Sequence, residues 1–180
     1  MSDGVIFVSG VYGVGKTTIC NLLSNELSIP SFSSSELISK HNGEEYGVNK
    51  FVEDKDKNQL ILIKAVKENL EAKPKFLLNG HFCILNSNNE IEYLPNFVYE
   101  ELSLTKIILL EAEPENIYKN LQKRDKKNYS IEIIEELLKS ERKQASKIAS
   151  MLNIPLYIHT MCFNKEDFNI IVSMIKESQV

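Results

Sequence analysis

The chain has 180 residues, 43% of them hydrophobic and 26% charged, which is typical of one soluble globular domain over residues 1–180. Its formal net charge of −4 gives no general attraction to a nucleic acid polymer or to an anionic membrane, so we expect neither as a partner. Cys20, Cys83 and Cys162 lie far apart and show neither a disulfide framework nor zinc spacing, which predicts reduced thiols in a cytoplasmic protein.

The first predicted elements are a strand over about 4–9 and a helix over about 16–28, joined by the stretch Gly10-Val11-Tyr12-Gly13-Val14-Gly15-Lys16-Thr17. This stretch fits G-x-x-x-x-G-K-[ST], the phosphate-binding P-loop, and lies in the strand–loop–helix context that the motif requires. Its backbone N–H groups would form a nest for phosphate oxygens, and the helix would direct its N-terminal dipole at the same charge. A chance glycine-rich turn is the alternative, which the flanking strand and helix disfavour.

The motif gives its last residues separate roles. Lys16 would reach the β- and γ-phosphates of ATP, and Thr17 would ligate Mg²⁺. Thr18 could add a hydroxyl bond to the α-phosphate, and we expect Lys16 to face solvent when no ligand is bound. The predicted nucleotide-binding residues are Gly10, Val11, Tyr12, Gly13, Val14, Gly15, Lys16, Thr17 and Thr18.

The next stretch, residues 31–38, reads as a short strand that ends in serines and a helix that starts there. Ser34 or Ser35 would be the N-cap, with Glu36 in the first turn. The serines could also be caps and nothing more.

A second helix is predicted over residues 55–72, where Leu60, Ile63, Val66 and Leu70 recur at helical spacing. The stretch before it, 41–54, has no clear period. A strand from Lys75 then exits through Asn79-Gly80-His81, a β-hairpin covers 82–94, and a short helix covers 95–102.

The rest of the chain alternates in the same way. A buried strand over 106–110 leads to a helix that opens at Pro114, and a short basic loop runs from Arg124 to Tyr129. A long helix over 130–152, a strand over 155–158 and a final helix capped by Asn164 complete the chain. Together these elements predict an α/β, three-layer P-loop NTPase fold, with a parallel five-stranded sheet and helices on both faces. Ligands of such sheets bind at the carboxyl ends of the strands.

The size and element order resemble those of the nucleoside monophosphate kinase family, and within it of the small, short-lidded adenylate kinase-like proteins of archaeal type. Besides the P-loop, the stretches Phe32–Ile38 and Leu110–Glu115 are similar to the family's acceptor-binding segment and to its turn before the lid helix. The resemblance implies an acceptor-binding segment over about 31–73 and a short lid over about 124–129. It implies that Arg124 clamps phosphates and that Arg142 could be the second clamp.

Each of these residues has a structural alternative. Arg124 lies in a run of charges that could simply be solvated, and Arg142 could form an ion pair with Glu135 or Glu136. His81 could be a turn residue. The residues expected to bind the acceptor are Ser34, Ser35, Glu36, Asn79 and His81.

Two positions depart from the family pattern. The acceptor helix of adenylate kinases usually carries an arginine that holds the acceptor phosphate, whereas Ser39 and Lys40 stand here. The strand end that normally supplies an aspartate near the metal carries Asn79. The acceptor could therefore be a nucleotide, a nucleoside or another alcohol.

The sequence thus predicts a P-loop kinase, a monomer or small homo-oligomer, that transfers a phosphoryl group from ATP·Mg²⁺ to a small acceptor, with a nucleoside monophosphate favoured. A regulatory ATPase module with a protein partner is the alternative, kept open by Asn79. A GTPase would carry a guanine-reading N/T-K-x-D element. The letters Asn164-Lys165-Glu166-Asp167 match it, but late in the chain and in the place of a helix cap.

Overall fold

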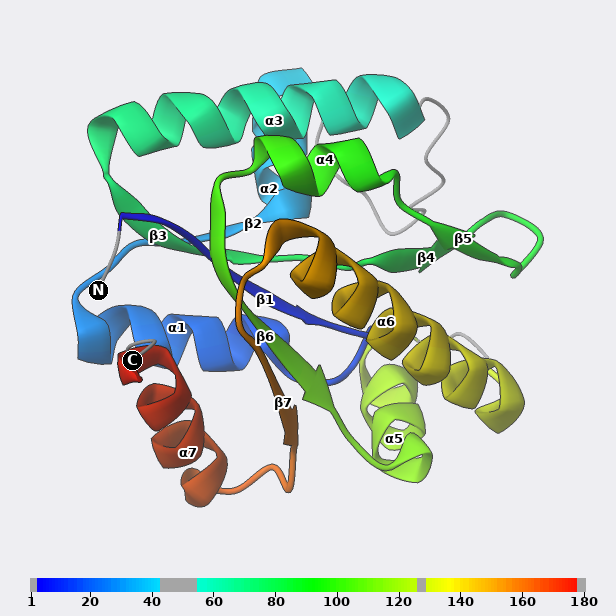
Figure 1. The fold of residues 1–180 in the computed structure, drawn as a ribbon. Coiled ribbons are helices and arrows are strands. Elements are labelled where there is room, and N and C mark those ends of the chain that lie inside the picture. Colours follow the sequence, from blue (N-terminus) through cyan, green and yellow to red (C-terminus); the bar gives the residue numbers. More distant parts are fainter. Residues whose placement is uncertain (1–2, 43–54, 126–128, 178–180) are drawn as a thin grey trace.

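The computed structural model describes residues 3–42, 55–125 and 129–177 (Figure 1). The strands are β1 (Gly4–Gly10), β2 (Ser31–Ser33), β3 (Lys75–Asn79), β4 (Cys83–Leu85), β5 (Ile91–Tyr93), β6 (Leu104–Glu111) and β7 (Leu156–Thr160). The helices are α1 (Lys16–Leu27), α2 (Ser34–Asn42), α3 (Lys55–Ala72), α4 (Asn96–Glu101), α5 (Pro114–Asp125), α6 (Ile131–Leu152) and α7 (Lys165–Lys176).

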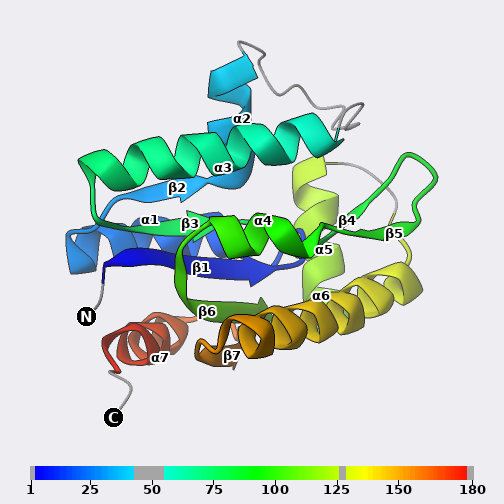
Figure 2. The ribbon, with the colours of Figure 1, turned by 45° about the horizontal axis from the view of Figure 1, so that its top comes forward.

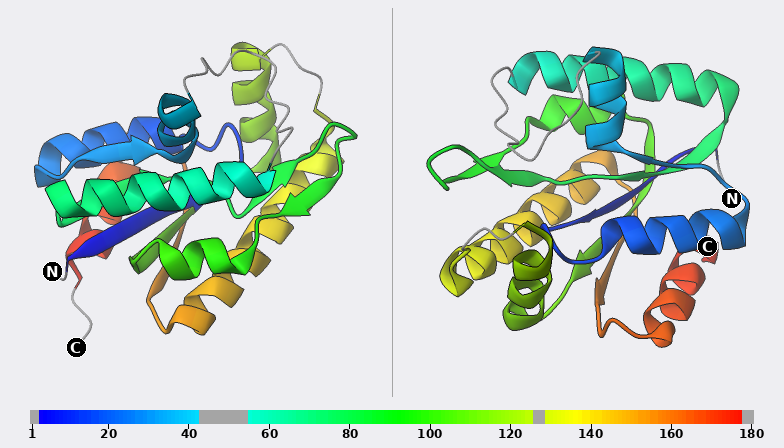
Figure 3. Two further views of the ribbon diagram at one scale, coloured as in Figure 1. Left: turned by 90° about the horizontal axis from the view of Figure 1, so that it is seen from above. Right: turned by 180° about the vertical axis from the view of Figure 1, so that it is seen from behind.

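Five strands form one sheet in the order β2-β3-β1-β6-β7, and every pairing in it is parallel. β1 lies in the middle, with Phe7 level with Leu78 of β3 and with Ile107 of β6. All three side chains are buried, as a strand covered on both faces requires. Figure 3 shows α1 and α7 on one face of the sheet and α3, α4 and α6 on the other. The predicted α/β fold with a five-stranded parallel sheet is confirmed.

Further helices and a hairpin lie beside the β2 edge of the sheet and at the carboxyl ends of its strands. Figure 2 shows α2 and α3 beside the β2 edge, and α5 with the β4–β5 hairpin at the end toward which β1 points. The carboxyl ends of the five parallel strands share that side. The antiparallel β4–β5 pair confirms the predicted hairpin. In the described ranges, no helix is both long and apolar enough to cross a membrane.

The helix over 55–72 has the predicted bounds and buries the predicted Ile63 and Val66, but the prediction for Leu60 is wrong. Leu60, expected on the apolar stripe, is 60% exposed, whereas Gln59 is only 6% exposed. The buried apolar residues of this helix are Leu62, Ile63, Ala65 and Val66. A polar side chain thus takes a core-facing position. The unpatterned stretch before the helix lies, from 43 to 54, outside the described residues.

The predicted basic loop begins later than expected. α5 continues to Asp125, so Arg124 is helical and the predicted loop start at Arg124 is wrong. No glycine or proline interrupts the chain between 115 and 125, and Lys123 and Arg124 favour the helix C-terminus, whose dipole is negative. Residues 126–128 of the predicted lid lie outside the described residues.

Candidate functional site

The P-loop connects the end of the central strand to the start of α1. At Gly10, φ is 146°, and a Cβ there would lie 2.4 Å from the carbonyl oxygen of Leu110, so only glycine fits between β1 and β6. At Gly15, φ is 96°, and its carbonyl accepts the N–H of Ile19 at 3.1 Å, which starts α1. The loop therefore has the strand–turn–helix form that lets backbone N–H groups and a helix N-terminus face one anion.

Lys16 is folded back onto the loop that it follows. Its Nζ donates to the carbonyl of Gly10 at 2.8 Å and to that of Val11 at 3.0 Å. The residue is 8% exposed, so the expectation that it faces solvent without ligand is wrong. The reason is that an ammonium group needs acceptors, and the two P-loop carbonyls supply them. The ammonium group is thus already held at the phosphate loop.

A buried carboxylate lies beneath the loop. Glu141 of α6 is 1% exposed and accepts hydrogen bonds from the backbone N–H groups of Gly10 at 3.1 Å, Phe82 at 2.9 Å and Cys83 at 2.8 Å. Burial raises the pKa of its carboxyl group to about 7, against the opposing effects of these N–H donors and of the Lys16 charge. This one side chain joins α6 to the start of the P-loop and to the start of β4.

The other wall of the loop is made by aromatic rings and by α5. Tyr12 lies with its ring centroid 4.3 Å from that of His81, and the Asn120 amide donates to the Gly13 carbonyl at 3.0 Å. Burial raises the pKa of the Tyr12 hydroxyl, and the positive charge of Arg124 opposes that rise. Arg124 is exposed and lines the same pocket as Tyr12. The helix before the predicted lid therefore contacts the phosphate loop directly.

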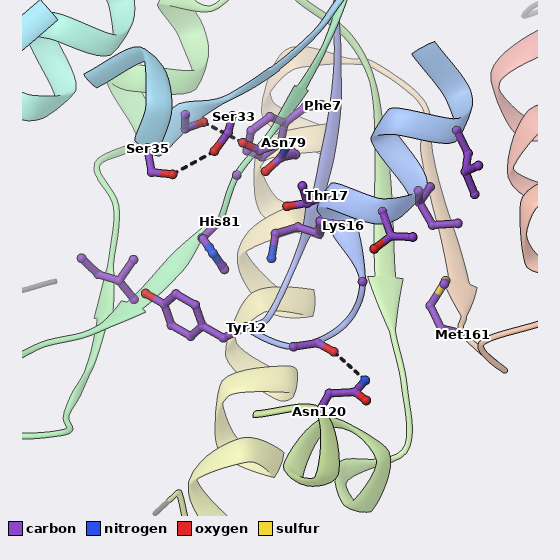
Figure 4. Close-up of a pocket in the computed structure, with 18 of the residues that line it drawn as sticks. Phe7, Tyr12, Lys16, Thr17, Ser33, Ser35, Asn79, His81, Asn120 and Met161 are labelled. Carbon is purple, nitrogen blue, oxygen red and sulfur yellow. Dashed lines mark hydrogen bonds between the residues drawn. The ribbon is translucent and has the colours of Figure 1, made fainter. Parts of the chain in front are cut away.

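A single pocket of about 1110 Å³ surrounds the P-loop. Its P-loop lining consists of Tyr12, Gly13, Gly15, Lys16, Thr17 and Thr18, whereas Val11 and Val14 are buried in the core. Figure 4 shows Met161 on one side of Lys16 and Thr17, and Ser33, Ser35 and His81 on the other. The pocket lining thus extends to both sides of the phosphate loop, and we call these two parts of the pocket its lobes.

The lobe toward α2, which we call the acceptor lobe, contains four of the five predicted acceptor residues. Ser34, Ser35, Asn79 and His81 line it. The Ser34 hydroxyl donates to the Asn79 carbonyl at 3.0 Å, and the hydroxyls of Ser33 and Ser35 are 2.8 Å apart. The first bond ties the start of α2 to the end of β3, and the second joins the last residue of β2 to α2 (Figure 4).

Gly80 makes the close packing at this point possible. A Cβ there would lie 2.8 Å from the Ser34 hydroxyl and 2.9 Å from the ring of Phe7. Neither neighbour can retreat freely, because Phe7 is buried in β1 and Ser34 begins a helix. The absence of a side chain at Gly80 therefore lets α2 approach the central strand.

Glu36 is the predicted acceptor residue that does not line the pocket. It is exposed, whereas Leu37 and Ile38 beside it are buried. Because these two apolar residues set which side of α2 faces the core, the Glu36 carboxylate lies on another side of the helix. As placed, it contacts neither lobe.

Arg142 also lies apart from the pocket lining. Its Nε donates to Oε1 of Glu111 at 2.6 Å, and a second guanidinium nitrogen bonds the other oxygen of that carboxylate. Glu111, at the end of β6, is therefore its partner in place of the helical neighbours Glu135 and Glu136. A paired geometry of this kind fixes the position of a guanidinium group. Arg142 would have to leave Glu111 to reach a phosphate.

The lobe toward α7, which we call the donor lobe, was not found from the sequence. Met161, Phe163 and Asn164 line it from the connection between β7 and α7, and Lys165 lines it from the first position of α7. A Cβ at Gly15 would lie 3.7 Å from the Phe163 ring and 3.8 Å from the Met161 methyl group, so both side chains stand beside the P-loop. Phe163 has φ of 58°, in the left-handed region that is uncommon for such a residue and frequent at binding sites.

The oxygen atoms around Thr17 suit a magnesium ion. The Thr17 hydroxyl and the Asn79 carboxamide both line the pocket, and neutral oxygens of this kind, with water and phosphate oxygens, are ligands that Mg²⁺ accepts. Among the described residues no cluster of three or more His, Cys, Asp or Glu side chains could hold a metal ion by itself. The residues present therefore fit an ion that arrives with a nucleotide.

Known proteins share both the sequence pattern and the fold. A family model described as an AAA domain matches residues 9–138, from the end of β1 into α6. An adenylate kinase from Thermoplasma acidophilum is 27% identical over 125 residues. These residues are 64% of this chain and 64% of that relative, so the match spans just under two thirds of the relative's length.

Solved structures of kinases share the fold over nearly the whole chain. Shikimate kinase from Acinetobacter baumannii, in complex with shikimate, has a TM-score of 0.61 at 17% identity, over 96% of this chain and 90% of that one. Shikimate kinase from Bacteroides thetaiotaomicron has a TM-score of 0.59 at 14% identity, over 97% of each chain. A gluconokinase from Sinorhizobium meliloti 1021 has a TM-score of 0.56 at 11% identity, over 96% and 93%. At such identities the likeness concerns the fold.

Proposed function

The chain belongs to the AAA domain family, and on that premise we propose that it is a phosphotransferase that moves the γ-phosphoryl group of ATP to a small acceptor. The observation that carries this proposal is the two-lobed pocket, in which Lys16 and Thr17 lie where the donor and acceptor lobes meet. Two small molecules bound in the two lobes would bring their reacting ends together over the phosphate loop. Such an arrangement catalyses transfer by positioning and by charge neutralisation.

Each group at the junction has a proposed role. Lys16, already held beside the loop, would exchange its carbonyl partners for phosphate oxygens, and the loop N–H groups would hold the same phosphates. Mg²⁺ bound with ATP through Thr17 would neutralise phosphate charge. Arg124, which lines the pocket from α5, would cover the transferring group and exclude water. Arg142 would assist the transfer only after exchanging Glu111 for a phosphate group.

The test of the reaction is ADP formation from ATP and Mg²⁺, with and without added acceptors. Acceptor-dependent turnover is the expected result. ATP hydrolysis that no small acceptor accelerates would instead favour the alternative, a nucleotide-binding regulatory ATPase with a protein partner. A nucleoside monophosphate is the acceptor that the similarity to adenylate kinase supports, and the lining of the acceptor lobe supports an uncharged one.

A Phe163→Ala variant should raise the KM for ATP about tenfold, because the donor base would lose the aromatic face beside the P-loop. The value of kcat should change little, since no atom of Phe163 would contact the transferring group. Steady-state kinetics with ATP varied at saturating acceptor measures both quantities. Phe97→Ala, equally exposed but outside the pocket, is the matched control. An unchanged KM for ATP in the Phe163 variant would mean that the base of ATP does not bind in this lobe.

An Arg124→Ala variant should lower kcat about a hundredfold and weaken ATP binding much less, because the guanidinium would act on charge that develops during transfer. Lys123→Ala, next to it on the exposed side of α5 and outside the pocket, should behave like wild type. Single-turnover rates and ATP titrations separate the two effects. If Arg124→Ala changes only the affinity for ATP, Arg124 binds the nucleotide without assisting transfer.

A further inference from the structure

Gln59 presents an unused hydrogen-bonding group to the acceptor lobe. It lies in the second turn of α3, is 6% exposed and lines the pocket. Its Oε1 is buried and has no hydrogen-bond partner in the described part of the chain. Leaving a buried acceptor oxygen unpaired is unfavourable, so native structures rarely keep one without a use. A ligand that donates a hydrogen bond at this point would satisfy it.

The walls around Gln59 are mostly apolar. Phe7, Ile38, Leu62, Val98 and Leu102 line the same lobe from five different elements or connections, and all are buried. Such walls favour a flat ring over a molecule covered with hydroxyl groups, because the ring faces bury apolar surface while the ring edge keeps its hydrogen bonds. A carboxamide can pair with a ring edge that carries an N–H donor beside an acceptor, as in the contact between glutamine and adenine.

In the described ranges, and apart from the imidazole of His81, the side chains near the acceptor lobe that could hold an acceptor phosphate are engaged or exposed. The Ser39 hydroxyl, which stands where the related kinases carry an arginine, donates to the Ser35 carbonyl at 2.8 Å within α2. Lys40 is exposed and does not line the pocket. The sequence has two arginines: Arg124 of α5, which the proposed function assigns to the transferring group, and Arg142 of α6, which is bound to Glu111. The described lining of the acceptor lobe therefore matches an uncharged molecule.

We propose that the acceptor is an uncharged, nucleoside-like molecule, whose ring binds between the apolar walls and donates an N–H to Gln59, and whose free hydroxyl receives the phosphoryl group. This inference rests on the proposed phosphotransferase function. The acceptor hydroxyl oxygen forms a bond to the γ-phosphorus of ATP, and the bond from that phosphorus to the β–γ bridging oxygen breaks. ADP leaves with the bond's electron pair, and the hydroxyl proton passes to solvent. The products are ADP and the phosphomonoester.

The experiment compares wild type with Gln59→Met, which keeps the length of the side chain and removes the carboxamide. ADP formation is measured with adenosine, guanosine, cytidine and uridine, with their 5′-monophosphates, and with shikimate and gluconate as non-planar acids. We expect one nucleoside to be used at least about tenfold better, in kcat/KM, than its monophosphate and than either acid. Gln59→Met should lower kcat/KM for that nucleoside about tenfold or more and leave the KM for ATP unchanged. Leu60→Met, on the exposed side of the same helix, is the control.

Thermal unfolding separates a role in recognition from a structural role. Without ligand, Gln59→Met should unfold at the same or a higher temperature than wild type, because an unpaired buried oxygen has been removed. A lower unfolding temperature without ligand would mean that Gln59 stabilises the fold, and would overturn the proposal. So would a preference for a monophosphate, for shikimate or for gluconate.

Failure of the phosphotransferase function is a different result. If no acceptor raises ADP formation, the proposed phosphotransferase function is wrong. Nucleoside binding is then measured by the change that each nucleoside causes in the unfolding temperature. A shift with a nucleoside that Gln59→Met abolishes would still support this recognition site. No shift with any of the four nucleosides would overturn it.

Discussion

Lys16→Ala should lower phosphoryl transfer by about a hundredfold to a thousandfold, as expected when a donor that stabilises transition-state charge is removed. The ammonium group is the cation fixed at the loop, 2.8 Å and 3.0 Å from two of its carbonyls, and alanine leaves nothing to follow the phosphates. The rate of ADP formation at saturating ATP, with the best acceptor, measures the loss. Lys139→Ala, an exposed lysine of α6, should keep wild-type turnover.

The folded state of these variants needs its own measurement, because Lys16 also bonds the loop. Lys16→Met keeps the aliphatic stem and loses only the charged end, so a similar loss in both variants would assign the effect to the ammonium group. Circular dichroism and thermal unfolding should show a folded chain in each case. Wild-type turnover in both variants would mean that Lys16 has no role in phosphoryl transfer.

Glu141→Leu should destabilise the folded chain by about 3 kcal/mol or more at pH 5, since three buried N–H groups, of Gly10, Phe82 and Cys83, lose their acceptor at once. Glu135→Leu, on the exposed side of the same helix, should change the free energy of unfolding by less than about 0.5 kcal/mol. Urea unfolding followed by circular dichroism gives both values. Glu141→Gln, which keeps one acceptor oxygen, should lie between them. Equal stabilities of Glu141→Leu and Glu135→Leu would contradict the role of Glu141 in joining these segments.

The same residue predicts a pH dependence. Burial raises the pKa of Glu141 from the ordinary 4.5 to about 7 in the folded chain. Between these values the folded chain retains a proton that the unfolded chain has released, so this group lowers the stability of wild type as pH rises through the window. The stability difference between wild type and Glu141→Leu should therefore shrink from pH 5 to pH 7.5. A difference that grows with pH would show that the carboxyl group ionises more easily in the folded chain.

The sequence was sufficient to predict the architecture, because its strongest signals are local. The P-loop, the uniformly apolar strands and the cap residue Asn164 each fix a backbone form through neighbouring residues, and the structure has all of them, with Asn164 in a complete capping box with Asp167. The resemblance to adenylate kinases is likewise confirmed by the Thermoplasma acidophilum relative.

The missed residues act across long separations in the chain. Glu141 bonds Gly10, which is 131 positions away, and Phe163 stands beside Gly15 only because β7 and β1 belong to the same sheet. A weak signal for Glu141 was present, since it falls on the buried stripe of α6 together with Ile134, Leu137 and Ala145. Gln59 falls in the same way on the buried face of α3. A polar residue inside an apolar stripe could have identified both.

Gly80 limits how far mutation can change which acceptors this pocket takes. An alanine Cβ at that position would lie 2.8 Å from the Ser34 hydroxyl and 2.9 Å from the Phe7 ring, so at least one of these two pocket-lining side chains would have to shift. A displaced lining residue is enough to slow a transfer that depends on alignment. A combinatorial library that seeks new acceptors should therefore vary Ile38, Leu62 and Val98, which line the lobe, and keep glycine at position 80 in every member.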